Sequence, residues 1–420
     1  MRASLVVAAL LPAACRPSPS LQPRSAGSGP AGRETAGAAS AAAPPRPGEL
    51  QAARRAALAR PRDAASRAAL ADVLLRAGDL PRAAAELRAA VRLAPQAPEP
   101  HRRLAGIFRA LGYLDREAES LEAALRADPG HAPSALRLGY ICLEARWLDR
   151  PQHAFEQARG ATPNDPAVQV ALATLAFVRR RMHAMERHAR EGLAQNPSSH
   201  ALTVILAESQ RLTHRLQESE QTLRRAISIA PSGDDRRKDY TRLAHLLLDR
   251  GWQPARFAEA EQAARAALEI SPDDPEARFW LGKAFERQGR LAEAESAYAE
   301  VVRTNPQLES VAFDLGRLYR RSPDPRLRRE GERLVQLYAR ADANARGYVE
   351  AQQRLQQSPR RPEVRRAMAR WHLRLHRLPL AILQLRDLVR EDPRDSESRR
   401  MLISALRRAG RDAEARHLAG

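Results

Sequence analysis

The 420-residue chain carries a formal charge of +20, because 70 Lys and Arg residues outnumber 50 Asp and Glu residues. Hydrophobic residues make up 44% and aromatic residues 4%, which predicts a folded chain with a core of mainly Ala, Leu and Val and excludes wholesale disorder. Two cysteines, Cys15 and Cys142, are too few for a disulfide scaffold or a four-cysteine zinc site, and no run of about 18 apolar residues could span a membrane.

Residues 1–15 have the features of an export signal. Arg2 gives one positive charge, an apolar run extends from Leu5 to Leu11, and small residues precede Cys15. The pattern resembles a bacterial lipoprotein signal, in which the cysteine becomes the acylated first residue of the mature chain. The resemblance implies lipidation of Cys15 and a membrane-anchored protein that faces the periplasm of the cell envelope. An ordinary secretory signal, or no signal at all, remains the alternative.

Residues 16–48 are rich in Pro, Ala, Ser and Gly and show no apolar period. Such a segment cannot bury enough apolar surface to offset the entropy lost on ordering it. We therefore predict a disordered tether that separates the rest of the chain from its anchor.

Prolines then recur at a fixed interval. Steps of 34 residues separate Pro61, Pro95, Pro129, Pro163, Pro197 and Pro231. A fixed period of this length indicates a solenoid of stacked units rather than separate globular domains.

The segment from Pro275 to Pro306 shows what one interval contains. Apolar residues recur at three- and four-residue spacing on both sides of Gly289, which predicts two amphipathic helices. Asp274 followed by Pro275 is typical of a helix start, and Gly289 suits the left-handed position that ends a helix. Pro306 cannot continue the second helix, so each interval is predicted to be a helical hairpin.

Counted from Pro275, this segment resembles the 34-residue pattern of the tetratricopeptide repeat (TPR) family. The residues that carry the resemblance are Leu281, Gly282, Phe285, Gly289, Ala294, Tyr298, Val301 and Pro306. Membership implies an all-α fold, a right-handed TPR superhelix (an α-solenoid) of roughly nine to ten helical hairpins. In that fold small residues let neighbouring helices approach, and large residues fill the gaps between them.

The repeats divide the chain into segments. We expect a main array over residues 49–340, an interruption over 341–361 and C-terminal repeats over 362–420. Within the interruption, Ala343–Gln357 reads as one unpaired helix and residues 358–361 as a linker that suits a hinge.

No catalytic motif stands out in the sequence. The GxSxG, HExxH, CxxC and P-loop patterns are all missing. His372 and His376 are spaced for a shared metal, but His372 occupies a core position of its repeat and no third ligand is near in sequence. Cys142 also occupies a core position, which predicts a small buried hydrophobe. We therefore predict no enzyme activity, no cofactor and no metal.

In TPR proteins the first helix of each hairpin lines a concave groove, so the resemblance also predicts which residues face inward. An apolar zone comprises Leu136, Tyr140, Leu143, Val170, Phe177, Val178, Val204 and Leu212. A basic zone comprises Arg317, Arg320, Arg321, Arg366, Arg370, Arg374, Arg400, Arg407 and Arg408. The apolar residues suit a partner's segment or packing against the next helix, and the arginines suit carboxylates and phosphates or a solvated face.

These features predict a non-catalytic scaffold that binds a partner protein or peptide, one that is acidic toward the C-terminal repeats. The alternative is a binder of nucleic acid or another anionic polymer through the C-terminal arginines. Few aromatic residues interleave with these arginines for base stacking, and an exported location would remove nucleic acid as a natural partner, so we consider this alternative weaker.

The positive charge is concentrated at one end. Residues 1–48 contribute +4, residues 49–314 contribute +3 and residues 315–420 contribute +13. Tests for anionic partners therefore belong at the C-terminal quarter of the chain.

Overall fold

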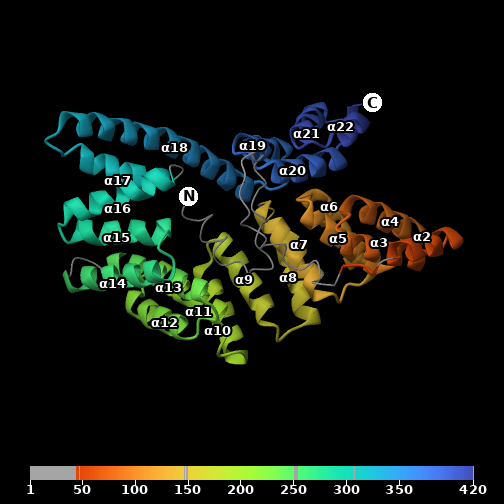
Figure 1. Ribbon diagram of the computed structural model, residues 1–420, viewed down its shortest axis with the longest axis horizontal. Coiled ribbons are helices and arrows are strands. Elements are labelled where there is room, and N and C mark those ends of the chain that lie inside the picture. Colours follow the sequence, from red (N-terminus) through yellow and green to blue (C-terminus); the bar gives the residue numbers. More distant parts are fainter. Residues whose placement is uncertain are drawn as a thin grey trace. The chain divides into compact units, whose positions relative to one another are not determined.

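A computed structural model of the chain describes residues 44–46, 48–145, 147, 150–249, 254–305 and 308–419. Every regular element in this part is an α-helix, and consecutive helices pack side by side as hairpins (Figure 1). From α3 to α22 the described chain contains ten successive helix pairs. The all-α repeat fold expected from the sequence is therefore confirmed.

The helices divide into two compact units, and the boundaries between the units lie inside α9 and α18. The middle unit comprises Leu172–Glu350. Its helices are the end of α9 (Pro166–Val178), α10 (Met182–Gln195), α11 (His200–Leu212), α12 (Leu216–Ser228), α13 (Gly233–Asp249), α14 (Pro254–Ile270), α15 (Pro275–Arg287), α16 (Leu291–Thr304), α17 (Glu309–Tyr319) and most of α18 (Pro325–Gln357).

The terminal unit joins two stretches that are far apart in the sequence, the chain up to Ala171 and the chain from Ala351 onward. Its first helices are α2 (Glu49–Ala59), α3 (Ala64–Arg76), α4 (Leu80–Leu93), α5 (Pro98–Ala110), α6 (Leu114–Ala127), α7 (Ala132–Glu144) and α8 (Arg150–Ala161). Its last helices are α19 (Pro362–Arg374), α20 (Leu378–Glu391), α21 (Ser396–Arg408) and α22 (Asp412–Ala419). Helix α20 packs against α6, which joins the two stretches (Figure 1).

The residues predicted to start and end the first helix of the Pro275 hairpin lie at the ends of α15. The Asp274 carboxylate accepts a hydrogen bond from the Glu276 backbone N–H at 3.0 Å, and Pro275 is the first residue of α15. Gly289 has a φ of +79°, the left-handed conformation that favours glycine. The predicted N-cap of this hairpin and the left-handed glycine that ends its first helix are therefore confirmed.

Small and large residues meet between the two helices of a hairpin, as the repeat pattern implies. A Cβ atom added to Gly282 would lie 2.5 Å from Cε1 of Tyr298, and one added to Gly139 would lie 2.2 Å from Cε1 of Phe155. Tyr298 and Phe155 are both fully buried. The aromatic ring of the second helix therefore occupies the space that the glycine of the first helix leaves open.

The interruption of the repeat count has a different structure from the one expected. Helix α18 runs without a break from Pro325 to Gln357, so the expected separate helix at Ala343–Gln357 is the second half of a 33-residue helix. The physical reason is that no proline or glycine pair breaks the helical pattern between these ends, and the long helix needs only one start, where Asp324 accepts a hydrogen bond from the Arg326 N–H at 2.8 Å. Residues 358–361 form the connection between α18 and α19.

The predicted signal at residues 1–15, with Cys15, and the tether up to residue 43 lie outside the described residues. Among the helices that are described, none is both long enough and apolar enough to cross a bilayer.

Candidate functional site

The residues predicted to form an apolar zone lie on α7, α9 and α11, and nearly all are buried. Leu136, Tyr140, Leu143, Val170, Phe177, Val178 and Val204 are between 1% and 9% exposed, and Leu212 is half-buried. Tyr140 packs edge-on against Phe155 with ring centroids 5.3 Å apart. These side chains are not an open surface here, and their role in binding a partner stays a prediction.

The residues predicted to form a basic zone divide into paired and unpaired arginines. In the middle unit Arg317 pairs with Glu286, and in the terminal unit Arg366 pairs with Asp395 at 2.7 Å. Arg370 pairs with Glu397, so the first helices of the last two hairpins, α19 and α21, are linked by ion pairs. Acidic residues of the chain itself therefore neutralise part of this zone.

Two further arginines of the basic zone contact neutral groups. The Arg374 guanidinium lies over the Trp371 ring, 5.1 Å from its centroid. Arg408 donates to the Leu373 carbonyl at 3.3 Å. Both side chains remain exposed, so their charges are still available to a ligand in solution.

Four arginines of the zone are exposed and have no partner among the described residues. They are Arg320, Arg321, Arg400 and Arg407. Arg400 and Arg407 are seven residues apart on α21, so they lie on the same face of this helix two turns apart. This face of α21 therefore carries two of the four unneutralised charges of the predicted basic zone.

A charged contact between distant repeats, which the sequence reading missed, joins α6 to the C-terminal helices. The Asp115 carboxylate on α6 receives two hydrogen bonds from Arg411, at 2.8 and 3.0 Å. Arg386 of α20 forms an ion pair with the same carboxylate at 2.8 Å. The Asp115 and Arg411 side chains are only 1% and 4% exposed, so this bidentate pair is shielded from water.

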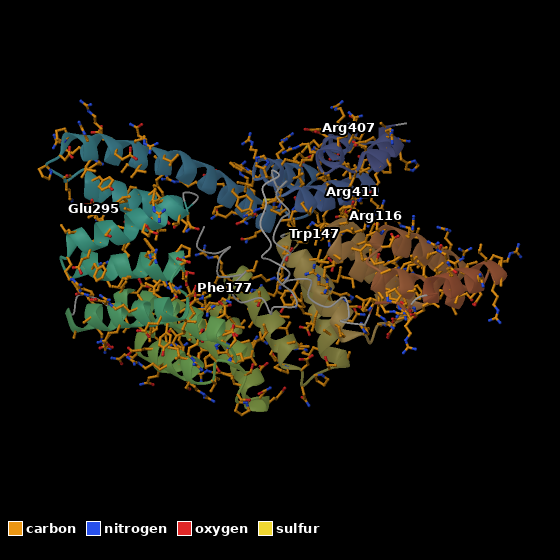
Figure 2. All side chains as sticks on the ribbon, viewed as in Figure 1. Arg116, Trp147, Phe177, Glu295, Arg407 and Arg411 are labelled. Atoms are coloured by element: carbon orange, nitrogen blue, oxygen red, sulfur yellow. The ribbon has the colours of Figure 1, made fainter. Side chains whose placement is uncertain are left out.

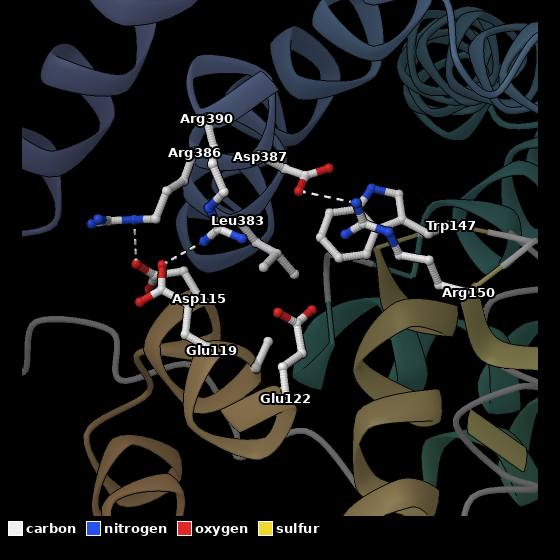
Figure 3. A pocket seen from close by; sticks show the side chains of 10 residues that line it. Asp115, Glu119, Glu122, Trp147, Arg150, Leu383, Arg386, Asp387 and Arg390 are labelled. Atoms are coloured by element: carbon white, nitrogen blue, oxygen red, sulfur yellow. Dashed lines mark hydrogen bonds and ion pairs between the residues drawn. The ribbon is translucent and has the colours of Figure 1, made fainter. Parts of the chain in front are cut away.

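Further ion pairs surround this buried pair. Arg390 of α20 donates to Glu119 of α6 at 2.7 Å, and Arg150 of α8 donates to Asp387 of α20 at 3.1 Å (Figure 3). On the other side of Asp115, Glu414 of α22 accepts hydrogen bonds from Arg116 of α6 and from Arg386, both at 2.7 Å. Each of these acidic groups is thus paired with an arginine from another helix of the contact.

The pKa of the Glu414 carboxyl shows how strongly the neighbouring arginines stabilise its charged form. Its burial would raise the pKa of the carboxyl, but hydrogen bonds from Arg411 and Arg116 lower that pKa to about 2. Arg411 and Arg116 lie next to each other where the C-terminal helices meet α6, whereas Arg407 lies farther from α6 (Figure 2).

A small apolar patch lies in the middle of the charged contact. Leu383 of α20 is 5% exposed and shares a core cluster with Ala118 of α6 and with Trp147, which lies between α7 and α8. Beside this patch, the Gln384 side chain donates to the Ala145 carbonyl at 2.7 Å, which satisfies a polar group at the end of α7.

The space left between α6, α8 and α20 is too small for a ligand. The cavity has a volume of about 10 Å³, which leaves room for one water molecule at most. Glu122 faces this space, where burial raises the pKa of its carboxyl above the ordinary value (Figure 3). The space between these three helices is therefore not a binding pocket.

One sequence signal pointed to this contact. Helix α20 carries an almost continuous apolar run from Leu380 to Leu385, so it has apolar residues on more than one face. A helix of that kind is buried on more than one side. The helix of its own hairpin covers one side of α20, and α6 covers another.

Two of the three remaining candidates for chemistry, Cys142 and His372, are buried, and His376 is exposed. Cys142 is a free thiol that is 2% exposed, and burial raises its pKa to about 12, far from the value of a reactive thiol. His372 is fully buried, and His376 lies in the turn after α19 with a φ of +55°. No group of three metal-ligating side chains occurs within the described residues.

Comparison with known proteins assigns the family. The sequence profile of a tetratricopeptide repeat family matches residues 48–98, 69–132, 242–309 and 366–420. The chain belongs to the TPR family. TPR proteins are generally non-catalytic scaffolds that bind proteins or peptides.

Several solved structures resemble the chain at low identity. TTC0263, a TPR protein of Thermus thermophilus, is 19% identical, covers 45% of this chain and 100% of its own, and has a TM-score of 0.38. YrrB, described as a TPR protein with an unusual peptide-binding site, is 13% identical over 46% of this chain and 96% of its own, with a TM-score of 0.36. A human IFIT1 dimer with PPP-AAAA is 16% identical over 88% of this chain and 93% of its own, with a TM-score of 0.40. The search of curated proteins gave no match.

Proposed function

We propose that this TPR protein is a non-catalytic scaffold that binds an acidic segment of a partner protein along α19 and α21. The observation that carries the proposal is a pair of exposed arginines on one face of α21, Arg400 and Arg407, which have no partner in the part of the chain that the structure describes. Exposed Arg374 and Arg408 on the ends of the two helices add positive charge to the same hairpins. Guanidinium groups bind carboxylates in a bidentate manner, so a Glu- or Asp-rich segment is the ligand that fits.

The test uses the full chain and a fluorescent poly-glutamate peptide as the probe. We expect the wild-type chain to bind the peptide, and the Arg400→Glu/Arg407→Glu variant to lose at least about tenfold in affinity. The matched control is Arg54→Glu/Arg55→Glu on α2, where two exposed arginines change the net charge equally. Equal losses in both variants would mean that net charge, and not this helix face, attracts the peptide.

The same assay separates a protein partner from a nucleic-acid partner. Arginine-rich surfaces also bind phosphates, and such binding weakens steeply with salt because counterions are released. If a single-stranded oligonucleotide bound more tightly than poly-glutamate, with a steep salt dependence and sensitivity to Arg400→Glu/Arg407→Glu, the anionic-polymer function would replace the proposed one.

The proposal also covers where in the cell the protein is located. The lipoprotein-like pattern that ends at Cys15 supports an exported scaffold, anchored to a membrane of the cell envelope by an acylated cysteine. Mass spectrometry of the mature N-terminus tests this: a chain that begins at an acylated Cys15 is expected. A chain that retains Met1 would contradict export, and unmodified cleavage would favour an ordinary secretory signal.

A further inference from the structure

The C-terminal helices have a core of their own. Buried apolar residues of α19–α22 form one cluster that includes Ile382, Leu385, Leu402 and Leu406. A separate cluster lies among α2–α5. Most of the apolar core of α19–α22 is therefore separate from that of the first helices, and Leu383 of α20 joins the cluster that contains Ala118 and Leu121 of α6.

The contact itself is held mainly by charge. Its apolar part is Leu383 with partly buried Leu380 against Ala118 and Trp147. The remaining described contacts are ion pairs, the hydrogen bond from Gln384 and the Arg411 guanidinium, which lies over the Tyr113 ring. Salt screens pairs that are partly exposed, such as Arg390 with Glu119, whose side chains are 52% and 30% exposed.

The acidic side of the contact is a regular stripe. Asp115, Glu119 and Glu122 follow one another at spacings of four and three residues on one face of α6. The arginines that face the stripe, Arg386 and Arg390, are four residues apart on α20, and Arg411 precedes α22. The pattern of charge on one side matches the pattern on the other.

The connection that joins α18 to the C-terminal helices is short. A four-residue turn, Ser358–Arg361, joins α18 to α19, and Arg360 and Arg361 in this turn are exposed. Rotation at these residues would move α19–α22 without breaking a helix.

We propose that α19–α22 form a clasp, a self-contained body that binds the acidic stripe of α6 in the same chain and is released when its ion pairs are screened or broken. Release exposes the Asp115 stripe and the arginines that now neutralise it, so the clasp controls whether these charges are open to other molecules. This inference does not depend on the proposed binding of a partner along α21.

A crosslinking experiment on the full chain tests the clasp. Glu119→Cys and Arg390→Cys place two thiols at a contact between α6 and α20, and Cys15→Ser removes the other cysteine outside the core. A short bis-maleimide should join them within one chain, at a rate that falls at least about tenfold between about 0.05 M and about 1 M salt. The control pair is Arg67→Cys and Glu86→Cys, an ion pair of 2.9 Å within one hairpin, whose crosslinking should not respond to salt.

A charge variant in the same background tests the role of the ion pairs. Arg386→Glu brings a third carboxylate next to Asp115 and Glu414, so we expect the crosslinking rate to fall at least about tenfold at low salt. Arg416→Glu changes the same charge on α22 at an exposed position away from the contact and should leave the rate unchanged. Far-ultraviolet circular dichroism checks that both variants keep their helices.

Three results would overturn the proposal. Absence of the crosslink at low salt would show that α20 does not lie on α6. A dimer as the sole product would show that a second copy of the chain binds the stripe. A rate that is indifferent to both salt and Arg386→Glu would show a permanent contact instead of a releasable one.

Discussion

At Gly282 only a hydrogen atom fits between two helices. The Tyr298 ring lies where a Cβ atom would be, and its hydroxyl donates to Glu286 at 3.0 Å, so the ring is fixed at both ends. Fully buried rings of this kind cannot move aside without disturbing the packing around them. The repeat therefore depends on the absence of a side chain at one position as much as on the presence of a large one at another.

We expect Gly282→Ala to lower the free energy of unfolding by about 1–3 kcal/mol, because the new methyl group would overlap Tyr298. Chemical unfolding followed by circular dichroism measures the change. The matched control is Gly106→Ala in α5, where no atom beyond the helix's own adjacent backbone lies within 4 Å of the added Cβ. Alanine should stabilise the helix there by about 0.5–1 kcal/mol. Equal effects of the two substitutions would contradict the packing argument.

Glu144 at the end of α7 predicts a pH dependence. Burial raises the pKa of its carboxyl from 4.5 to about 7, although Arg137 acts in the opposite direction. Its Oε1 is buried with no hydrogen-bond partner in the described chain. The folded state therefore holds the proton more tightly than the unfolded state, so stability falls as the pH rises from about 4.5 to about 7 and then levels off.

Glu144→Gln should remove this loss of stability at high pH. We expect the variant to be more stable than the wild type by on the order of 2 kcal/mol at about pH 8, with a difference that vanishes below about pH 4.5. Hydrogen exchange of the α7 amides at the two pH values measures it. A gain of the same size at both pH values would mean that ionisation of Glu144 is not its cause.

Among the helices, local signals in the sequence were enough to predict the start and the end of α15. Asp274 with Pro275 and Gly289 are such signals, because each acts through its own backbone or through residues a few positions away. The long helix α18 was predicted in part only. A break in the repeat count predicts a break in the helix, although no residue there requires one.

The N-cap residue of α15, Asp274, gives a prediction about the stability of one helix. Asp274→Ala removes the hydrogen bond to the Glu276 N–H and the ion pair with Arg237, so we expect a loss of about 1–2 kcal/mol. Asp274→Asn keeps a cap acceptor and removes the charge, so it should lose less. Urea unfolding of the two variants measures both contributions. Equal losses would assign the whole effect to the ion pair.

The candidate site was harder to predict than the helices. A family pattern places Arg400 and Arg407 on the first helix of a hairpin, which their position on α21 agrees with. Nothing in a 34-residue period indicates that Asp115 and Arg411, 296 residues apart, form a buried pair. Such contacts between distant repeats depend on where the chain returns in space, and only the apolar run on α20 hinted at one.

Over the whole molecule, the C-terminal excess of charge has two different parts. Arg386, Arg390 and Arg411 are neutralised by acids of α6, whereas Arg400 and Arg407 stay exposed. The charge of +13 over residues 315–420 is therefore not all available to an external partner. Part of it holds the terminal unit together.

Coupling between distant helices gives a whole-molecule prediction. Leu385 in the core of α19–α22 is fully buried, so Leu385→Ala should destabilise these helices by about 2–5 kcal/mol. Because α20 packs against α6, hydrogen exchange should become faster in α6 but not in α12 of the middle unit. Leu223→Ala in α12 serves as the reciprocal control. Faster exchange in α12 and unchanged exchange in α6 after Leu385→Ala would contradict this coupling.

The buried pair of Asp115 and Arg411 can form only after a delay during synthesis of the chain. At about 5–20 residues per second, the ribosome adds Arg411 about 15–60 s after Asp115. During this interval α6 has left the ribosome while the arginines that will cover its acidic face do not yet exist. Any molecule able to bind that face meets the nascent chain first, and the later α20–α22 segment has to displace it.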